Sequence, residues 1–404
     1  MRLHRNLVFA VIDGLSQIFN EGQYADRVVE KLLKRDKRWG ARDRGFVAET
    51  TYEIVRWKRL YAEIAEVKEP FDRDKLWRIF AVWAVLRGIH LPDWKYFEDT
   101  PVRRIKGKFD ELSKIRKFKE SIPDWLDELG VKELGEAVWT REIAALNATA
   151  DVILRVNQLK TDLKNLQKNL AEAGIETETI AKYPDALKLK ERANVFNTDA
   201  FQKGFFEVQD ASSQLVADFL QVEKGMRVCD ACAGAGGKSL HLASLMENKG
   251  QVIALDIYEN KLHELKRRAK RAGAHNIETR LIDSNKVIKK LDQKIDRLLI
   301  DAPCTGLGVL RRNPDAKWKL QPQFLENIQK TQMEILTGYA RMVKPGGKLV
   351  YATCSILPSE NRHQINYFLQ SEMGKSFVLE DEKKIFPSEG FDGFYMARLS
   401  KNQI

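Results

Sequence analysis

The stretch DACAGAGGKS, residues 230–239, decides the fold class of this 404-residue chain. It follows a short apolar run and opens a helix, so its glycines lie in a strand-to-helix turn. Glycines let a ligand approach the backbone closely, and the first amides of a helix are free donors. The stretch is neither the dinucleotide fingerprint nor a phosphate-binding P-loop. A tight structural turn without a ligand is the alternative interpretation.

Outward from this turn, strands and helices alternate from about residue 206 onward. This alternation predicts an α/β domain with a mostly parallel sheet covered by helices on both faces. Ligands of such a sheet bind at the carboxyl ends of its strands. The expected strands are Arg227–Ala231, Gln251–Asp256, Glu278–Ile282, Arg297–Asp301, Lys348–Thr353, Ser376–Leu379 and Gly393–Leu399. The expected helices are Ser239–Glu247, Glu259–Ala272, Gln323–Val343 and Glu360–Leu369.

Three aspartates stand at or just after consecutive strand ends: Asp256, Asp283 and Asp301. Asp256 follows the glycines by roughly 20 residues, the spacing at which an acid takes a ribose hydroxyl pair. Asp283 is placed to accept from an adenine amino group. Hydrogen bonds to a charged acceptor are worth about 1.5–3 kcal/mol. Together with the glycine turn, the three acids favour a nucleoside cofactor, and the absence of a P-loop argues against a triphosphate.

Two cysteines follow the ends of the fourth and fifth expected strands, Cys304 within DAPCTG (301–306) and Cys354 within YATCS (351–355). A lone cysteine is most often a small buried hydrophobe, which is the role expected of Cys229. Two cysteines at adjacent strand ends beside a cofactor crevice instead favour catalysis. Cys229 and Cys232 also have the spacing of a redox or zinc site. Without a second cysteine pair, and with six histidines in all, no metal site is predicted.

The first 130 residues or so have the periodicity of a helical domain. A buried stripe is expected from Leu7, Val8, Val11, Ile12, Leu15, Ile18 and Phe19, and a further helical segment from about Arg42 to Ala62. Seven of the eight tryptophans precede residue 140, and we expect them to fill a helical core. Two basic clusters, Lys34–Arg38 and Arg103–Lys108, are either a solvated face or RNA contacts.

A small α+β unit is expected next. Val152–Val156 has the pattern of a buried strand, Thr161 can cap a helix that Gly174 ends, and Ile175 onward is extended. The domains expected are therefore a helical domain over 1–130, a small α+β subdomain over 131–205 and the α/β domain over 206–404.

The composition of the chain indicates which class of partner it binds and in which compartment it works. The formal net charge is +11, which favours a polyanionic partner. No apolar run reaches the roughly 18–20 residues of a membrane span, and no signal cleavage site follows the N-terminal apolar run. Only four cysteines occur, which favours a reducing compartment and predicts a cytoplasmic protein.

These motifs resemble those of a known family, the RNA 5-methylcytosine methyltransferases of the RsmB/NOP/Sun type. The resemblance covers about residues 150–404. At the N-terminus, Asp43–Phe46 and Tyr52–Arg56 are similar to the NusB-like domain of the bacterial RsmB group, which methylates one cytosine of small-subunit ribosomal RNA. Ala235 departs from the family, which usually has proline there. The segments that carry the resemblance are Gln209–Gln214, Asp230–Ser239, Asp301–Asp315 and Thr353–Asn361.

The resemblance implies a Rossmann-like methyltransferase domain, preceded by an all-α NusB-like domain and a small α+β RNA-binding subdomain. It implies that Cys354 attacks the cytosine, that Cys304 removes the carbon-5 proton or expels the enzyme, and that Asp301 holds the ring nitrogen. The implied partner is 16S ribosomal RNA or a small-subunit assembly intermediate, bound by a monomer. S-adenosylmethionine would be bound by Cys232, Ala233, Gly234, Ala235, Gly236, Gly237, Lys238, Asp256, Asp283 and Asp301.

Several alternatives remain open on the sequence. A DNA cytosine-5 methyltransferase would use Cys304 as its nucleophile. The substrate could instead be tRNA or another RNA, or the chain could be a ribosome-assembly factor without activity. The segment after the Cys304 motif contains four residues that we expect to bind the nucleic acid by charge and stacking: Arg311, Arg312, Lys317 and Trp318.

Overall fold

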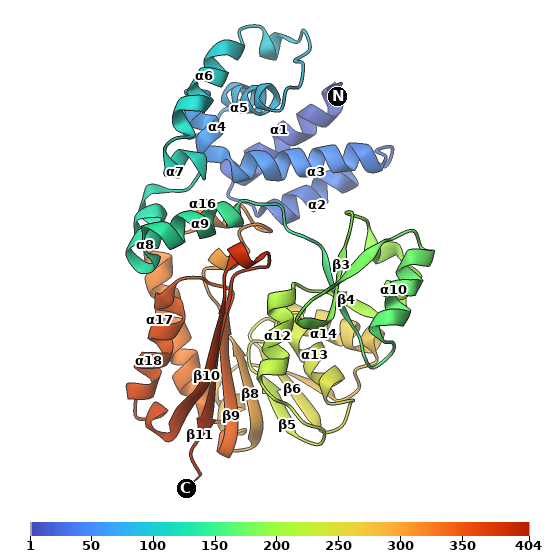
Figure 1. Cartoon of the computed structure of the whole chain (residues 1–404), viewed down its shortest axis with the longest axis vertical. Helices are drawn as coiled ribbons and strands as arrows, with labels where there is room; N and C mark the ends of the chain where they lie inside the picture. The colour runs from blue at the N-terminus through green and yellow to red at the C-terminus, as the bar shows by residue number, and fades with distance from the viewer. Residues whose placement is uncertain (1, 404) are drawn as a thin grey trace. The chain divides into compact units, whose positions relative to one another are not determined.

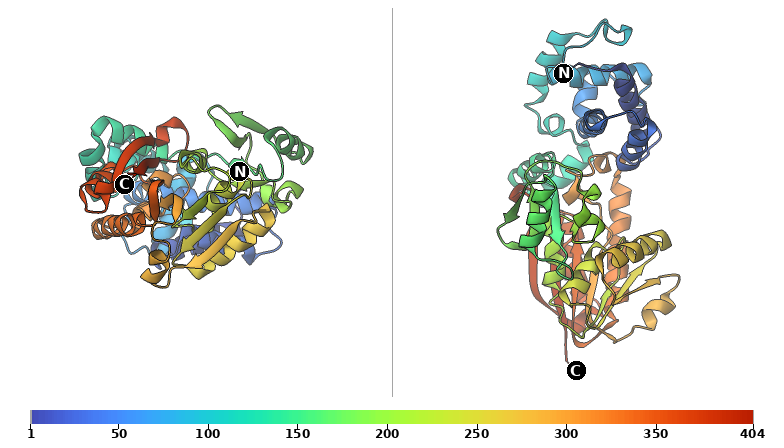
Figure 2. Two further views of the ribbon diagram at one scale, coloured as in Figure 1. Left: turned by 90° about the horizontal axis from the view of Figure 1, so that it is seen from below. Right: turned by 90° about the vertical axis from the view of Figure 1, so that its right-hand side faces the viewer.

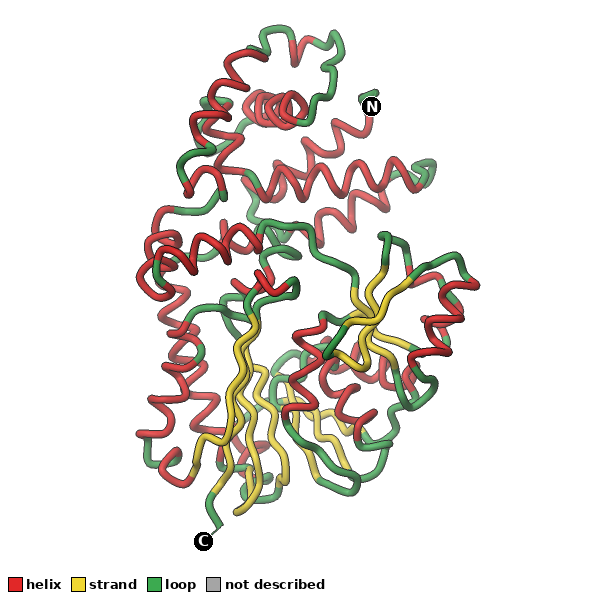
Figure 3. Tube along the Cα trace, viewed as in Figure 1, coloured by secondary structure: helices red, strands yellow, loops and turns green. Residues whose placement is uncertain are grey.

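The computed structural model describes residues 2–403, which form two compact units. The first, here called the helical unit, consists of Met1–Ala148 together with Leu310–Pro322. The second, the sheet unit, consists of Thr149–Val309 together with Gln323–Ile404. Figure 1 gives the element labels, and Figure 3 shows that the strands gather in the sheet unit whereas the N-terminal segment is helical.

The sheet unit contains a seven-stranded sheet in the order β10-β11-β9-β8-β5-β6-β7. The pairs formed by β7, β6, β5, β8 and β9 are parallel, whereas β11 runs antiparallel to both β9 and β10. All seven predicted strands are present, and the α/β prediction is confirmed. Strand order reverses between β5 and β8, which is where ligands of such sheets bind. The strands are β5 (Arg227–Asp230), β6 (Gln251–Asp256), β7 (Ile277–Leu281), β8 (Ile295–Asp301), β9 (Val343–Thr353), β10 (Phe377–Ile385) and β11 (Phe394–Lys401).

Helices cover both faces of this sheet, as Figure 2 shows, and two separate apolar cores result. In one core, Leu240 and Leu265 pack against one face of the sheet. In the other, Leu336 and Ile365 pack against the opposite face. The two cores fix the sheet in place between the helices. The helices are α12 (Ala211–Phe219), α13 (Gly237–Leu245), α14 (Glu259–Ala272), α15 (Asn285–Lys289), α17 (Pro322–Ala340) and α18 (Arg362–Gln370).

A second, four-stranded antiparallel sheet in the order β2-β3-β1-β4 lies at the start of the sheet unit. Its helix α10 begins after Asp162, whose carboxylate accepts from the amide of Asn165 at 2.8 Å. The prediction that Thr161 caps this helix is therefore wrong by one residue, whereas Gly174 does end it with a φ of +75°. The elements are β1 (Ile153–Val156), α10 (Leu163–Glu172), β2 (Thr177–Ile180), β3 (Tyr183–Leu189), α11 (Asp199–Gln202) and β4 (Phe206–Val208).

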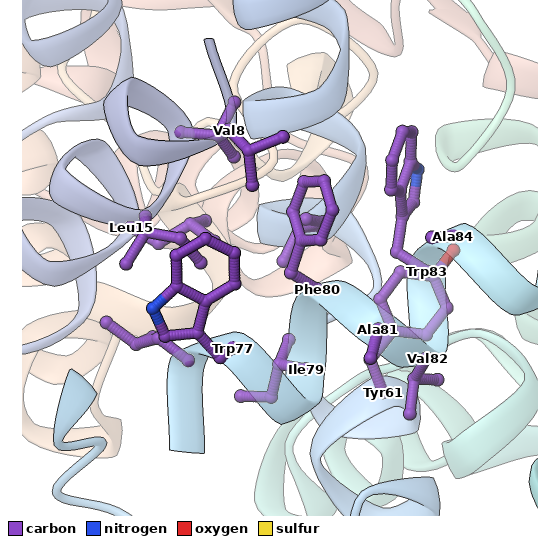
Figure 4. Packing of buried hydrophobic residues seen from close by; sticks show 14 of the residues in the cluster. Val8, Leu15, Tyr61, Trp77, Ile79, Phe80, Ala81, Val82, Trp83 and Ala84 are labelled. Carbon is purple, nitrogen blue, oxygen red and sulfur yellow. The ribbon is translucent and has the colours of Figure 1, made fainter. Parts of the chain in front are cut away.

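Figure 4 shows part of an apolar core of the helical unit, with Trp77 and Phe80 among its buried residues. In this core Trp77 stacks on Tyr96 with ring centroids 4.2 Å apart. The predicted stripe of the first helix is buried, apart from Phe19, which packs partly buried against the core. The segment predicted from Arg42 to Ala62 is two helices, because the chain turns at Trp57. The helices are α1 (Arg5–Phe19), α2 (Ala25–Arg35), α3 (Ala41–Arg56), α4 (Lys58–Ile64), α5 (Arg73–Leu86), α6 (Val102–Leu112), α7 (Arg116–Lys119), α8 (Asp124–Leu134) and α9 (Glu136–Leu146).

Leu310–Pro322, which contains the short helix α16 (Ala316–Lys319), packs into the helical unit. Lys317 is only 1% exposed, and the Trp318 Nε1 donates to the carbonyl of Val55 at 2.7 Å. Arg311 is also buried and donates to the carbonyl of Ala145 at 3.2 Å. The prediction that these three side chains grip nucleic acid is therefore wrong, since they build this unit instead. Across residues 2–403, no helix combines the length and the apolar character needed to span a membrane.

Candidate active site

The glycine turn leads from β5 into α13 at the carboxyl edge of the sheet. Gly234 and Gly236 have φ values of +53° and +87°, a region that favours glycine. A Cβ added at Gly236 would lie 2.4 Å from the Leu265 side chain, so a close approach as well as the φ value requires glycine there. The space next to Gly234 and Gly237 is open, since an added Cβ at either would meet no protein atom within 4 Å.

The first predicted acid, Asp256, is held rigidly beside this turn. Its Oδ2 accepts from the Gly234 amide at 2.7 Å and its Oδ1 from the Tyr258 amide at 2.8 Å. Because each carboxylate oxygen has two acceptor sites, both oxygens can still accept a hydroxyl. A buried acceptor with spare capacity, beside an open glycine turn, fits the ribose of an adenosyl group.

The other two acids differ in exposure. Asp283 is exposed just after β7, and its Oδ1 accepts from the Ser284 hydroxyl at 2.9 Å. Asp301 ends β8, and its Oδ2 accepts from the Lys238 Nζ at 2.6 Å. The structure thus places all three acids at the ends of adjoining or nearby strands, on the edge that carries the glycine turn.

Lys238 joins the glycine turn to Asp301. Its side chain is 12% exposed, and its ammonium lies 5.0 Å from the centre of the Phe394 ring. Burial alone would lower the pKa of Lys238, but the Asp301 carboxylate outweighs burial and raises it. The ammonium therefore stays charged against an acid of the site. The sequence placed Lys238 only in the cofactor turn and did not indicate this pairing.

The two predicted cysteines are brought together. The Sγ atoms of Cys304 and Cys354 lie 3.3 Å apart, and both residues are half-buried with free thiols. The hydrogen bond with Cys354, together with burial, raises the pKa of Cys304 well above its ordinary value. Either thiol can donate in this contact, and the raised pKa of Cys304 favours the protonated form of that residue.

A buried carboxylate that the sequence did not single out ties the two cysteine loops together. Glu360 is 0% exposed and accepts from the Thr305 amide at 2.8 Å and from the Thr305 hydroxyl at 2.6 Å. It also accepts from the Ser355 hydroxyl and from the Gln332 side chain. Thr305 follows Cys304 and Ser355 follows Cys354, so one side chain fixes both loops. Burial raises the pKa of Glu360 despite these four donors.

The remaining two cysteines lie in and after β5. Cys229 is fully buried in the strand, as predicted, and burial raises its pKa. Cys232 is half-buried at the glycine turn, and burial raises its pKa well above the ordinary value. Within residues 2–403, no three His, Cys, Asp or Glu side chains are grouped so that they could hold a metal ion.

Comparison with known proteins gives two family matches. Residues 217–400 match the family described as "16S rRNA methyltransferase RsmB/F", and residues 122–196 match "Methyltr_RsmF/B-like, ferredoxin-like domain". The "Probable ribosomal RNA small subunit methyltransferase B" of Bacillus subtilis is 35% identical over 337 residues, which are 78% of this chain and 72% of that protein.

Solved structures agree with these matches. The crystal structure of PH0851 superposes with a TM-score of 0.83 at 27% identity, covering 99% of this chain and all of that one. A methyltransferase homolog protein from Pyrococcus horikoshii superposes with a TM-score of 0.63 at 27% identity, covering 71% of this chain and 97% of its own.

Proposed function

This chain belongs to the RsmB/F family of methyltransferases, and we propose that it methylates carbon 5 of a cytosine in small-subunit ribosomal RNA. The observation that carries the proposal is the pair of sulfur atoms 3.3 Å apart, which follow the strands β8 and β9. β8 ends in Asp301, which is paired with Lys238 from the start of α13. Carbon 5 of cytosine is a poor nucleophile. A thiolate that adds to carbon 6 makes it enamine-like, and this is covalent catalysis by an activated thiol.

S-adenosylmethionine is the cofactor of this family, and when bound it supplies an electrophilic methyl group to carbon 5. The residues that would hold it are the open glycine turn, the Asp256 carboxylate and, at its exposed strand end, Asp283. The turn offers the free amides of the α13 N-terminus, and Asp256 offers acceptors for ribose hydroxyls.

In the first step, the Cys354 thiolate forms a bond to carbon 6 of the cytosine. Ring nitrogen 3 takes up a proton from solvent, and the Asp301 carboxylate accepts a hydrogen bond from it and so keeps the ring electron-poor; this proton returns to solvent when the 5,6 double bond re-forms. The electron pair of the 5,6 double bond becomes available at carbon 5, which takes up the methyl group. The positive charge of Lys238 offsets the negative charge of Asp301 while the charge of the cytosine ring changes. The base has to be single-stranded or flipped out to reach this edge, at a cost of a few kcal/mol.

In the second step, carbon 5 loses its proton and the bond between Cys354 and carbon 6 breaks. Once the sulfur of Cys354 is bonded to carbon, it is neutral, and the main cause that raises the pKa of Cys304 is gone. Cys304 can then lose its proton to solvent, and its thiolate takes the proton from carbon 5. The 5,6 double bond re-forms as the sulfur–carbon bond breaks, which restores the Cys354 thiolate and the Cys304 thiol. One proton is released in each turnover, as the transfer of a methyl group from a sulfonium to carbon requires.

The test is a methyl-transfer assay with the purified chain, labelled S-adenosylmethionine and three substrates: small-subunit ribosomal RNA, bulk tRNA and duplex DNA. Digestion to nucleosides followed by mass spectrometry should show 5-methylcytosine from the ribosomal RNA alone. Label in tRNA or in DNA would favour those alternative substrates. The absence of methylated cytosine from all three, with naked RNA and with small subunits from a deletion strain, would support the alternative of an assembly factor without activity. A cytoplasmic location and a monomeric state stay predictions.

A further inference from the structure

The sheet unit has a groove away from the glycine turn whose charged side chains are all cations. Here called the basic groove, it is a shallow, open depression of about 660 Å³ between α14 and the loop around α11. Five of its lining side chains are Lys160, Lys203, Arg267, Lys270 and Arg271, and no carboxylate is among the described residues that line it. Such a concentration of one sign of charge attracts a polyanion.

Two of these cations build the groove. The Lys160 Nζ donates to the carbonyls of Lys203 and Arg271 at 2.8 and 2.7 Å, which joins the α11 loop to the end of α14. The Arg271 guanidinium lies 3.9 Å from the centre of the Phe201 ring and is paired with Glu207. The floor of the groove is therefore rigid and is set by internal contacts.

The other three cations are exposed and available. Lys203 lies 3.6 Å from Asp199, and Arg267 lies 3.4 Å from Glu264, in pairs whose side chains are largely in solvent. Pairs of this kind are worth at most about 1 kcal/mol, so a phosphate can replace the carboxylate. Lys270 is exposed on the same helix, one turn beyond Arg267.

Aromatic side chains continue the groove on one side. A neighbouring hollow shares Arg267 and Arg271 with the groove and is also lined by Phe196 and Phe201. Its two carboxylates, Glu207 and Glu264, are paired with arginines of the same hollow. Phe196 is 51% exposed, although exposing an aromatic ring to water is unfavourable. Cations that follow a backbone, next to a ring on which a base can stack, are the combination that binds single-stranded nucleic acid.

The same helix connects the groove to the cofactor turn. Arg268, next to Arg267 in sequence, donates to the carbonyl of Ala235 at 2.8 Å and to the Glu207 carboxylate at 2.9 Å. α14 starts after Asp256 at the catalytic edge, and Lys270 lies 11 residues after Glu259, about 17 Å along the helix axis. A strand that reaches the groove would therefore run beyond the cysteine site by several nucleotides.

We propose that the basic groove binds the sugar–phosphate backbone of the RNA substrate at a point remote from the methylated base. The inference rests on the proposed function only for the identity of that RNA. An acidic protein segment is the other class of ligand that five cations could attract. The exposed Phe196 beside the groove, on which a base can stack, favours a nucleic-acid backbone.

The experiment measures binding of a labelled small-subunit RNA fragment to the full chain, without cofactor, over a salt series. The variant is Lys203→Ala/Arg267→Ala/Lys270→Ala. The matched control, Lys224→Ala/Lys249→Ala/Lys375→Ala, removes three exposed lysines elsewhere in the sheet unit. We expect the groove variant to lose about tenfold or more in affinity at low salt. The slope of log affinity against log salt should become shallower by about 2, because about 0.7 counterion is released per single-strand phosphate contact.

Equal RNA affinity and equal salt slope in the groove variant and the control would overturn the proposal. This is also the result expected if the groove binds an acidic protein and not RNA. Binding is measured apart from methyl transfer, so the two proposals fail separately. If the chain methylates no cytosine but the groove variant still loses RNA affinity and slope, only the proposed function fails. If methylation occurs and the groove variant binds like the control, only the groove proposal fails.

Discussion

Cys304 and Cys354 have different roles in the proposed mechanism, although their sulfur atoms are 3.3 Å apart. The hydrogen bond and burial raise the pKa of Cys304, and Glu360 fixes the residue that follows each cysteine. In the proposed mechanism Cys304 keeps its proton while Cys354 attacks and gives it up only afterwards, which is what a nucleophile and a later base require when they share one small site.

Replacement of Glu360 tests how the loops are held. Glu360→Ala leaves the Thr305 amide and two hydroxyls without their buried acceptor, at about 1–3 kcal/mol for each unsatisfied group. We expect kcat to fall by at least about tenfold while the affinity for S-adenosylmethionine stays the same, because Glu360 contacts the cysteine loops and not the glycine turn.

Glu360→Gln is the control, because it keeps the shape and one acceptor oxygen and should restore most of the lost kcat. Equal losses in cofactor affinity and kcat, with no rescue by glutamine, would show that Glu360 acts through general stability. In that case its role in positioning the cysteines would be wrong.

At the scale of elements, two strands of the small antiparallel sheet hold α13. The Arg155 side chain, from β1, donates to the carbonyl of Gly237 at 2.7 Å. His241, in the same helix, lies 3.5 Å from the Asp185 carboxylate of β3 and is 2% exposed. The small antiparallel sheet therefore supports the helix that begins the cofactor turn.

His241 predicts a pH dependence of stability. Burial, and next the charge of Arg155, lower its pKa to about 4 from an ordinary 6.5. The folded state thus favours the neutral ring, so this contribution is complete above pH 6.5 and is lost progressively as the pH falls from 6.5 to about 4. At pH 5 the loss is about 2 kcal/mol, since each pKa unit is worth about 1.36 kcal/mol.

Urea unfolding at pH 7.5 and pH 5 measures this effect. His241→Leu should lose about 2 kcal/mol less than the wild-type protein between the two values. His275→Leu, which removes an exposed histidine, should keep the wild-type difference. Identical pH dependence in all three proteins would contradict the assignment of His241 as a neutral buried group.

The elements of the seven-stranded sheet could be predicted because apolar runs of strand length alternate with amphipathic helices. Local departures from this pattern could not be predicted. The turn at Trp57 splits one periodic segment because tertiary packing overrides its helical pattern. Asp162 and Thr161 are both good caps, and only the backbone conformation decides between them.

At the scale of the whole molecule, the helical unit is built from two separate segments of the chain. Leu310–Pro322 follows the Cys304 motif in sequence but packs among the N-terminal helices. Nothing in the basic composition of Arg311, Arg312, Lys317 and Trp318 distinguishes a segment buried in another unit from an RNA-binding loop. The sequence therefore predicted the cysteine pair and the strand-end acids, which local motifs carry. It missed Glu360 and the Lys238–Asp301 pair, which arise from folding.

Trp318 gives a prediction at this scale. Trp318→Ala removes a partly buried indole and its hydrogen bond to Val55, at about 3–5 kcal/mol for such truncations. Hydrogen exchange should accelerate in α3 and α4, because Trp318 contacts Val55 and lies 5.2 Å from the Lys58 ammonium. The strands β5 to β8 should keep their protection. Faster exchange in the strands than in α3 and α4 would contradict the assignment of this segment to the helical unit.

Covalent RNA adducts of the two cysteine variants test the central claim most directly. Each variant is incubated with S-adenosylmethionine and a methylatable RNA and then run on a denaturing gel, with Cys229→Ala as the control. Cys304→Ala should give a persistent protein–RNA adduct, because no thiolate removes the carbon-5 proton. Cys354→Ala should give none, and Cys229→Ala should behave like the wild-type protein. An adduct in Cys354→Ala and none in Cys304→Ala would contradict the account, because Cys304 would then be the nucleophile.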